Sequence, residues 1–162
     1  KMEALLELLP VWLEGELQGE RKAIIFTQFS QMADILEDAL QVPYQALKIT
    51  GEVNDRATII NAFNTKPEHR VLVMTSAGQY GLNIQSASVV IHYDQEWSLA
   101  KMEQRSGRSH RIGQKLTVFE YNLLCKGTID MYIRRILRKK QEVADFMMDM
   151  REVREMLEYE EQ

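Results

Sequence analysis

The sequence of 162 residues lacks several features that mark whole classes of protein. Its only cysteine is Cys125, so an internal disulfide framework and a cysteine-based metal cluster are excluded, and a reducing, intracellular compartment is expected. The longest apolar runs are a few residues long, too short for a transmembrane helix, and no signal peptide opens the chain. Metal-site spacings such as CxxC and HExxH are also missing, so no resident metal is predicted.

The signatures of a self-sufficient enzyme are missing as well. The chain has no GxxxxGK[ST] phosphate loop, no acidic DExx motif for magnesium, no GxGxxG dinucleotide fingerprint and no evident Ser/His/Asp set. It therefore carries no complete catalytic machinery of a familiar kind. The sequence starts at Lys1 without an initiator methionine, which favours a piece of a longer polypeptide.

Charge is unevenly distributed along the chain. The formal net charge is -4, which argues against a generally basic surface for nucleic acid. However, residues 101–115 carry five Lys/Arg against a single acid, and residues 134–140 carry five more with no acid. Any site for a polyanion must therefore be local.

Short apolar runs rich in β-branched residues alternate with amphipathic segments. The predicted strands are residues 22–27, 44–50, 71–75, 88–94 and 117–124. This alternation predicts βαβ units, and so an α/β fold with a mostly parallel sheet covered by helices on both faces.

The helices between these strands have identifiable start and stop signals. Ser30 and Asn54 are candidate N-caps, Ser98 starts a helix that ends near Gly113, and Thr128 starts a long final helix. The leading segment is expected to be helical but interrupted at Pro10, and to pack outside the first strand. The helical spacing predicts apolar faces at the following positions: Met32, Ile35, Leu36, Ala39 and Leu40; Ile59, Ile60 and Phe63; and Ile129, Tyr132, Ile133, Ile136, Leu137, Val143, Ala144 and Met147.

Ligands of such sheets gather at the carboxyl ends of the strands, so the loops that follow the strands are the candidate sites. The loops at residues 27–30, 50–56, 75–83 and 93–97 meet this condition. The loop 75–83 is rich in Gly and hydroxyl side chains, and its backbone N–H groups could cradle a phosphate. Alternatively, its glycines only make a turn.

The segment EQRSGRSHRIGQ places Arg105, Arg108 and Arg111 at every third residue. On a helix these three guanidinium groups share one face, where they repel one another. A cationic helix end would need only one of them, whereas three match the oxygens of a phosphate-bearing ligand. His110 is interpreted as a surface or packing residue.

Two later segments admit two interpretations each. RRILRKK (134–140) is either a solvated cationic face or a contact for nucleic-acid backbone or an acidic partner. FMMDM (146–150) is either a methionine-rich contact surface or the end of a helix that packs on its own domain. Cys125, His92 and Tyr93 are all interpreted as packing residues.

Taken in order, four segments resemble motifs IV to VI of superfamily-two helicases. They are IIFTQFSQM, ITG with a later R and I..F, VMTSAGQYGLNIQSASVVIHYDQEWS, and QRSGRSHRIGQ. The HRIGQ ending resembles the Snf-type (SWI/SNF) DNA translocases in particular. The similarity covers about residues 20 to 140 and implies the second RecA-like lobe of a two-lobed motor.

The resemblance implies a division of the ATP site between two lobes. The missing first lobe would supply the phosphate loop and the acids that hold Mg²⁺ with ATP. Arg108 and Arg111 match the family's arginine pair, with Arg111 the favoured finger, and Gln104 would orient the motif. Asn83 matches the contact to the nucleotide ribose, and Gly81 matches the turn that brings it there. Alone, the lobe is expected to hydrolyse no ATP.

The resemblance also implies a grip on the backbone of double-stranded DNA. Hydroxyls, amides and backbone N–H groups would make these contacts, which carry no base information. The matching positions are Gln28, Thr50, Thr75, Ser76 and Gly78. The chain departs from the family's common pair of glycines by placing Gln79 after Gly78.

The implied protein is a DNA-dependent ATPase whose partners are duplex DNA, its own first lobe and, through the basic 134–140 face, a DNA-bound complex. A strand-separating helicase or restriction-type motor, and a docking lobe with a dead cleft, are the alternatives. Compact loops favour a bacterial or viral source and a cytoplasmic location over a nuclear one. The expected organisation is a leading helical segment (1–20), the lobe (21–127) and a C-terminal helix packed on the lobe (128–162).

Overall fold

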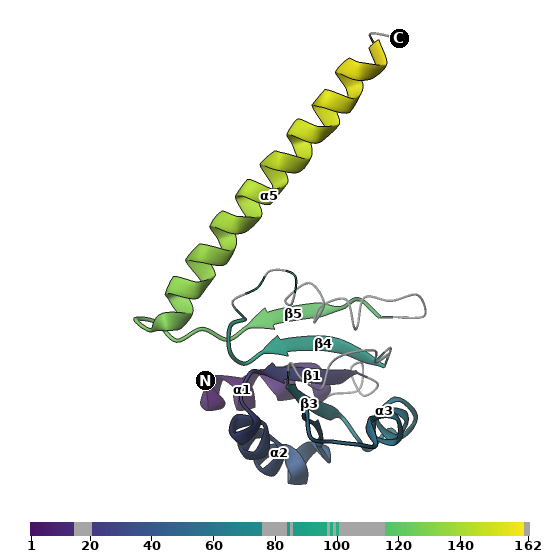
Figure 1. Cartoon of the computed structure of the whole chain (residues 1–162). Coiled ribbons are helices and arrows are strands. Elements are labelled where there is room, and N and C mark those ends of the chain that lie inside the picture. Colours follow the sequence, from purple (N-terminus) through teal and green to yellow (C-terminus); the bar gives the residue numbers. More distant parts are fainter. Residues whose placement is uncertain are drawn as a thin grey trace.

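The computed structural model describes residues 1–14, 21–75, 84, 86–96, 98, 100 and 116–160, with the backbone alone at 149 and 152–160. Its centre is a sheet of five parallel strands in the order β2-β3-β1-β4-β5 (Figure 1). The strands are β1 (Lys22–Thr27), β2 (Leu47–Ile49), β3 (Val71–Thr75), β4 (Ala87–His92) and β5 (Phe119–Asn122). The predicted α/β architecture with a parallel sheet, of the RecA-like type, is confirmed.

The three inner strands are buried along their whole length. Every residue of β1, β3 and β4 is buried, which is why the sequences of these strands are mainly apolar. The edge strand β5 instead alternates half-buried and exposed residues. The sequence predicted a longer strand over residues 117–124. Only the central four residues of that run, Phe119–Asn122, form β5 and pair with β4.

Helices cover both faces of the sheet. The helices α1 (Met2–Leu13) and α2 (Ser30–Tyr44) pack on one face, while α3 (Arg56–Thr65) packs on the other. Alternate residues of each strand feed the two cores, since successive side chains point to opposite faces. In β1, for example, Ile25 joins the α1/α2 core and Phe26 joins the α3 core.

The predicted interruption of the leading helix at Pro10 was wrong, and the strand predicted to follow Pro43 begins later than expected. Helix α1 continues through Pro10, and α2 continues through Pro43 to Tyr44, which had been expected to start a strand. A proline removes one backbone hydrogen bond of a helix. Burial of Leu9 and Leu13 in α1, and of Leu40 and Tyr44 in α2, holds each helix together on either side of its proline. Strand β2 is correspondingly short.

The helix starts also differ from the predictions. Helix α3 is capped by Asp55 rather than Asn54, because the Asp55 carboxylate accepts a hydrogen bond of 3.1 Å from the backbone N–H of Thr58. Helix α2 begins at Ser30 itself, after Phe29, with no side-chain cap. Its buried face consists of Ala33, Leu36, Leu40 and Tyr44. The predicted members Ile35 and Ala39 are exposed.

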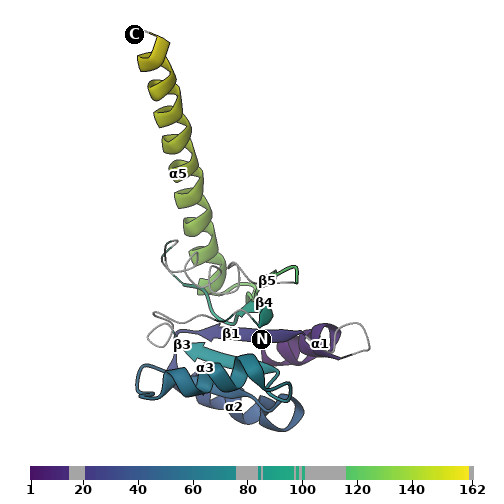
Figure 2. The same cartoon turned by 90° about the vertical axis from the view of Figure 1, so that its right-hand side faces the viewer.

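Helix α5 (Ile129–Glu160) extends away from the rest of the molecule in both views (Figures 1 and 2). Ile133 and Leu137 are buried, whereas Tyr132, Val143 and Met147 of the predicted packing face are exposed. The described lobe thus reaches only the first turns of α5, and no described residue of the lobe covers the rest of the apolar face. No described helix combines the length and the apolar character needed to span a membrane.

Candidate functional site at the carboxyl edge of the sheet

The carboxyl ends of β1 and β3 form the centre of the candidate site. The loop after β1 leads to α2 on one face, and Ile84, which follows the loop after β3, lies in the core of the opposite face. Ligands of α/β proteins bind at the carboxyl ends of the parallel strands. Thr27 and Thr75 end these two strands as register partners.

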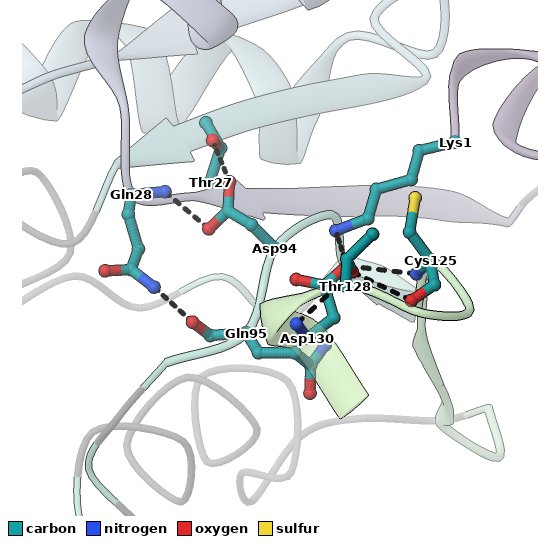
Figure 3. Close-up of polar contacts among 8 residues, drawn as sticks. All are labelled: Lys1, Thr27, Gln28, Asp94, Gln95, Cys125, Thr128 and Asp130. Atoms are coloured by element: carbon teal, nitrogen blue, oxygen red, sulfur yellow. Dashed lines mark hydrogen bonds and ion pairs between the residues drawn. The ribbon is translucent and has the colours of Figure 1, made fainter. Parts of the chain in front are cut away.

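Asp94 ties the loop after β1 to the loop after β4 (Figure 3). Its carboxylate accepts a hydrogen bond from the Thr27 hydroxyl through Oδ2 and one of 2.8 Å from the Gln28 backbone N–H through Oδ1. The Gln28 side-chain amide in turn donates to the backbone carbonyl of Gln95. The two loops are therefore held as one unit by a charged acceptor, which strengthens each hydrogen bond.

Three of the predicted DNA-contact residues meet at this edge. Gln28 follows β1, Thr50 follows β2 and Thr75 ends β3. Gln28 is half-buried, whereas Thr50 and Thr75 are buried. The other predicted site residues lie outside the described residues: Ser76, Gly78, Gly81, Asn83, Gln104, Arg105, Arg108 and Arg111.

Sequence reasoning identified the loop 93–97 but gave no role to Asp94 or Gln95. Both follow a buried strand directly, as a ligand-binding or loop-fixing residue commonly does. Gln95 is 3% exposed, and its side-chain Nε2 has no hydrogen-bond partner among the described residues. Asp94 pairs with the Thr27 hydroxyl because β4 lies beside β1 in the sheet. The sequence alone does not reveal that these two strands are neighbours.

His92 and Tyr93 are packing residues, as predicted. His92 is fully buried, stacks on Phe26 with 5.8 Å between the ring centroids, and places Nε2 2.7 Å from Oε1 of Glu120. Burial raises the pKa of the Tyr93 hydroxyl, and the nearby Cys125 and Asp94 add to this effect. Cys125 was expected to be buried but is half-buried, because it lies beyond the end of β5 in the connection to α5.

A second polar cluster joins the start of α5 to the sheet edge (Figure 3). The Lys1 ammonium lies 2.6 Å from Oδ2 of Asp130, and the same oxygen accepts a 3.0 Å hydrogen bond from the Cys125 backbone N–H. The Thr128 hydroxyl donates to the Cys125 carbonyl at 2.8 Å. These contacts fix the first turn of α5 to the first residue of the chain.

The pKa of Asp130 sets a specific dependence of stability on pH. Burial would raise it, but the Lys1 ammonium and the Cys125 N–H outweigh burial and hold it below its ordinary value of 3.8. Between the folded pKa of Asp130 and its ordinary value of 3.8, the unfolded chain therefore binds more protons than the folded chain. The Lys1–Asp130 contact therefore contributes its full stability above about pH 3.8 and loses it as the pH falls through the folded pKa.

We expect Asp130→Asn to lower the free energy of unfolding at neutral pH and to leave a smaller difference from wild type below pH 4. Urea denaturation at several pH values measures this difference. Glu142→Gln is the matched control, since Glu142 pairs with Arg138 on an exposed part of α5, where an ion pair contributes little. A difference that stays constant down to pH 2 would contradict the assignment.

Among the described residues, no three His, Cys, Asp or Glu side chains are grouped as metal ligands. Of the ten site residues assigned from the helicase resemblance, three lie at the described edge of the sheet and seven lie outside the described residues. In the described part, Asp94 holds the loop that carries Gln28 to the loop after β4, while Thr50 and Thr75 lie at the ends of the neighbouring strands β2 and β3.

This fold and this edge define a RecA-like α/β lobe. Residues 1–113 match the family described as the helicase conserved C-terminal domain. The chain belongs to this family, as the C-terminal lobe of a SWI/SNF-type superfamily-two ATPase.

Individual relatives agree with this assignment. The chromatin-remodeling ATPase INO80 of Mycosarcoma maydis is 36% identical over 143 residues, which cover 86% of this chain and 8% of that protein. The TATA-binding protein-associated factor mot1 of Aspergillus fumigatus is 38% identical, with 81% of this chain and 8% of that protein covered. An ATP-dependent helicase of Mycoplasma pneumoniae is 35% identical, with 89% of this chain and 14% of that protein covered.

A solved structure shows the same architecture. The C-terminal part of the Fun30 ATPase domain superposes with a TM-score of 0.77 at 29% identity, over 84% of this chain and 44% of that one. The chain thus spans only a small part of the curated relatives it matches. Both fungal and bacterial proteins occur among these relatives, so the bacterial or viral source stays a prediction.

Proposed function

We propose that this chain is the second motor lobe of an ATP-dependent translocase that moves along double-stranded DNA inside the cell. The relatives include ATPases and an ATP-dependent helicase, which supports ATP hydrolysis by a protein that contains this lobe. The nucleotide would be bound mainly by a first lobe that carries the phosphate loop and the magnesium ligands. Arg111 and Arg108 would reach across to its γ-phosphate, positioned by Gln104, while Asn83 and the Gly81 turn approach the ribose.

The observation that carries the DNA part of this proposal is the meeting of Gln28, Thr50 and Thr75 at one edge of the sheet. Neutral amide and hydroxyl groups can hydrogen-bond phosphate oxygens without reading bases, which suits a motor that tracks any sequence. Ser76 and Gly78, which directly follow β3 in the chain, would add backbone and hydroxyl contacts to the same strand.

The Asp94 contacts support a mechanical role for this edge. Gln28 cannot move independently of the loop after β4, because both of its hydrogen-bonded groups lead to that loop. The segment that follows this loop contains Gln104, Arg108 and Arg111. Closure of the two lobes around ATP would therefore act on the DNA-contact edge through the loop after β4, which the Asp94 and Gln95 hydrogen bonds hold to Gln28.

The test is ATP hydrolysis with and without a first lobe. The purified 162-residue chain is expected to hydrolyse no ATP, whereas the full-length protein is expected to hydrolyse it and to accelerate when duplex DNA is added. Steady-state phosphate release measures both. Turnover by the chain alone, or full-length turnover indifferent to DNA, would overturn the proposal.

The enzyme alternative is a motor that separates strands. The mycoplasma relative is described as a helicase, whereas the fungal relatives are described as a remodeling ATPase and a TATA-binding protein-associated factor. Strand release from a forked duplex by the full-length protein would favour the helicase. Displacement of a bound protein from an intact duplex, without strand release, supports the translocase proposed here.

A further inference from the structure

Asp94 lies between the parts of the chain that the proposed function assigns to DNA and to ATP. On one side its carboxylate contacts the loop after β1, which carries Gln28, one of the proposed DNA contacts (Figure 3). On the other side the chain continues from Asp94 to Arg108 and Arg111, the proposed contacts to the γ-phosphate. A single carboxylate thus holds a DNA contact and begins the segment that leads to the ATP contacts.

The carboxylate organises the turn between β1 and α2. Oδ1 accepts a 2.8 Å hydrogen bond from the Gln28 backbone N–H, and Oδ2 accepts one from the Thr27 hydroxyl. The Thr27 hydroxyl oxygen in turn accepts a 3.3 Å hydrogen bond from the Phe29 backbone N–H. Helix α2 has no side-chain cap of its own. Asp94, from outside the helix, therefore sets the backbone of the turn that leads into α2, through hydrogen bonds that an ionised acceptor strengthens.

The same contacts fix the direction of the Gln28 side chain. Its Nε2 donates to the Gln95 backbone carbonyl, while its backbone N–H is held by Asp94. An amide nitrogen carries two N–H groups, so Gln28 can donate one to Gln95 and the other to a phosphate oxygen. Because the side chain is held at both ends, it loses little conformational freedom when DNA binds, and such pre-organisation favours binding.

The loop after β4 is packed into the body of the lobe. Tyr93, Gln95 and Glu96 are all buried, and the Tyr93 backbone N–H donates to the Phe26 carbonyl at 2.9 Å. Close-packed interiors have low compressibility and transmit strain. A displacement of Gln28 is therefore passed to the loop after β4 rather than absorbed between the two loops.

We propose that Asp94 is a positioning residue through which DNA binding accelerates ATP hydrolysis. This role rests on the proposed function and adds the route of its regulation. The carboxylate holds Gln28 against the loop after β4, so a DNA phosphate bound by Gln28 shifts both loops together. The shift then passes along the chain to the segment that carries Arg108 and Arg111. Asp94 contacts neither the nucleotide nor DNA in this scheme and acts through Gln28.

The full-length Asp94→Asn protein tests this role. Asparagine keeps the size of the side chain, but its Nδ2 is a donor in place of one of the two oxygens that accept from the loop after β1. The ratio of turnover with saturating duplex DNA to turnover without DNA is expected to fall by about 10-fold, within the range of roughly 5- to 150-fold that is usual for coupling between two sites. Steady-state phosphate release measures both rates.

Asp38→Asn is the matched control, because it removes the same charge from an exposed position on α2. It is expected to keep the wild-type ratio. Loss of both rates by the same factor in Asp94→Asn, with the ratio kept, would assign Asp94 a purely structural role and refute the proposal. A wild-type protein that DNA does not stimulate would remove the proposed function and this role with it, so the wild-type measurement distinguishes the two failures.

Thr27 provides a second test that leaves the carboxylate unchanged. Thr27→Ser keeps the hydroxyl that donates to Asp94, whereas Thr27→Val replaces this buried hydroxyl with a methyl group of similar size. The serine variant is expected to keep the DNA-stimulated ratio and the valine variant to lower it. Equal ratios in the two variants would count against the proposal even if Asp94→Asn failed to fold.

Discussion

Arg111→Ala in the full-length protein is expected to lower DNA-stimulated ATP hydrolysis by roughly 10³- to 10⁵-fold, the contribution of an arginine finger to phosphoryl transfer. The guanidinium group would stabilise the charge that develops on the transferred phosphoryl group, and alanine supplies no donor. Arg108→Ala is expected to have a similar or smaller effect, and Arg105→Ala the smallest. Phosphate release under saturating ATP and DNA measures the three variants.

The control for this series is Arg151→Ala, which removes the same charge from an exposed position on α5 outside the basic 134–140 face. It is expected to leave hydrolysis within about 2-fold of wild type, since a surface substitution away from the chemistry changes little. A full-length Arg111→Ala protein with normal turnover would contradict the assignment of Arg111 as the finger, whereas a wild-type full-length protein with no turnover would favour a lobe that only docks partners. Nucleotide binding should survive in Arg111→Ala, because the first lobe holds most of the ATP.

Leu9→Ala is expected to destabilise the chain by about 2–5 kcal/mol, the usual cost of truncating a fully buried leucine. Leu9 is 0% exposed and belongs to the core between α1, α2 and the sheet. Leu6→Ala, on the same helix, is expected to cost about 0.5 kcal/mol, since Leu6 is 43% exposed. Urea denaturation of the two variants compares them directly.

This pair of substitutions tests whether α1 is part of the lobe. If α1 were only a leading segment resting on the first strand, Leu9→Ala and Leu6→Ala would have nearly equal effects. The Arg70 guanidinium supports the integral role, because it donates to the Leu13 carbonyl at the end of α1 and to the Arg21 carbonyl before β1. The family match, which begins at residue 1, agrees.

The sequence predicted the inner sheet better than its surroundings. The bounds of β1 and β3 were predicted to the residue, because strands buried on both faces must be continuously apolar. Local signals failed where tertiary packing outweighs them. The prolines at 10 and 43 are tolerated because buried residues on either side hold their helices, and Ile35 is exposed although it fits a helical apolar spacing.

The candidate site was likewise predicted only in part from the sequence. Gln28, Thr50 and Thr75 were predicted together, because the carboxyl ends of parallel strands always meet at one edge. Asp94 was missed, because its importance comes from the pairing of β1 with β4. The end of β1 and the start of β4 are separated by 59 residues in the chain. The arginine, ribose and loop residues stay predictions, since they lie outside the described residues.

The length of α5 gives the small cluster at its base a mechanical consequence. The helix has 32 residues, about 48 Å at 1.5 Å per residue. A tilt of about 5° at Asp130 would therefore swing its far end by about 4 Å, more than the length of a hydrogen bond. The Lys1–Asp130 ion pair and the buried Ile133 and Leu137 hold the base of the helix, so a small tilt there is enlarged along its length. Helix α5 therefore has the geometry of a lever arm with its fulcrum at the lobe.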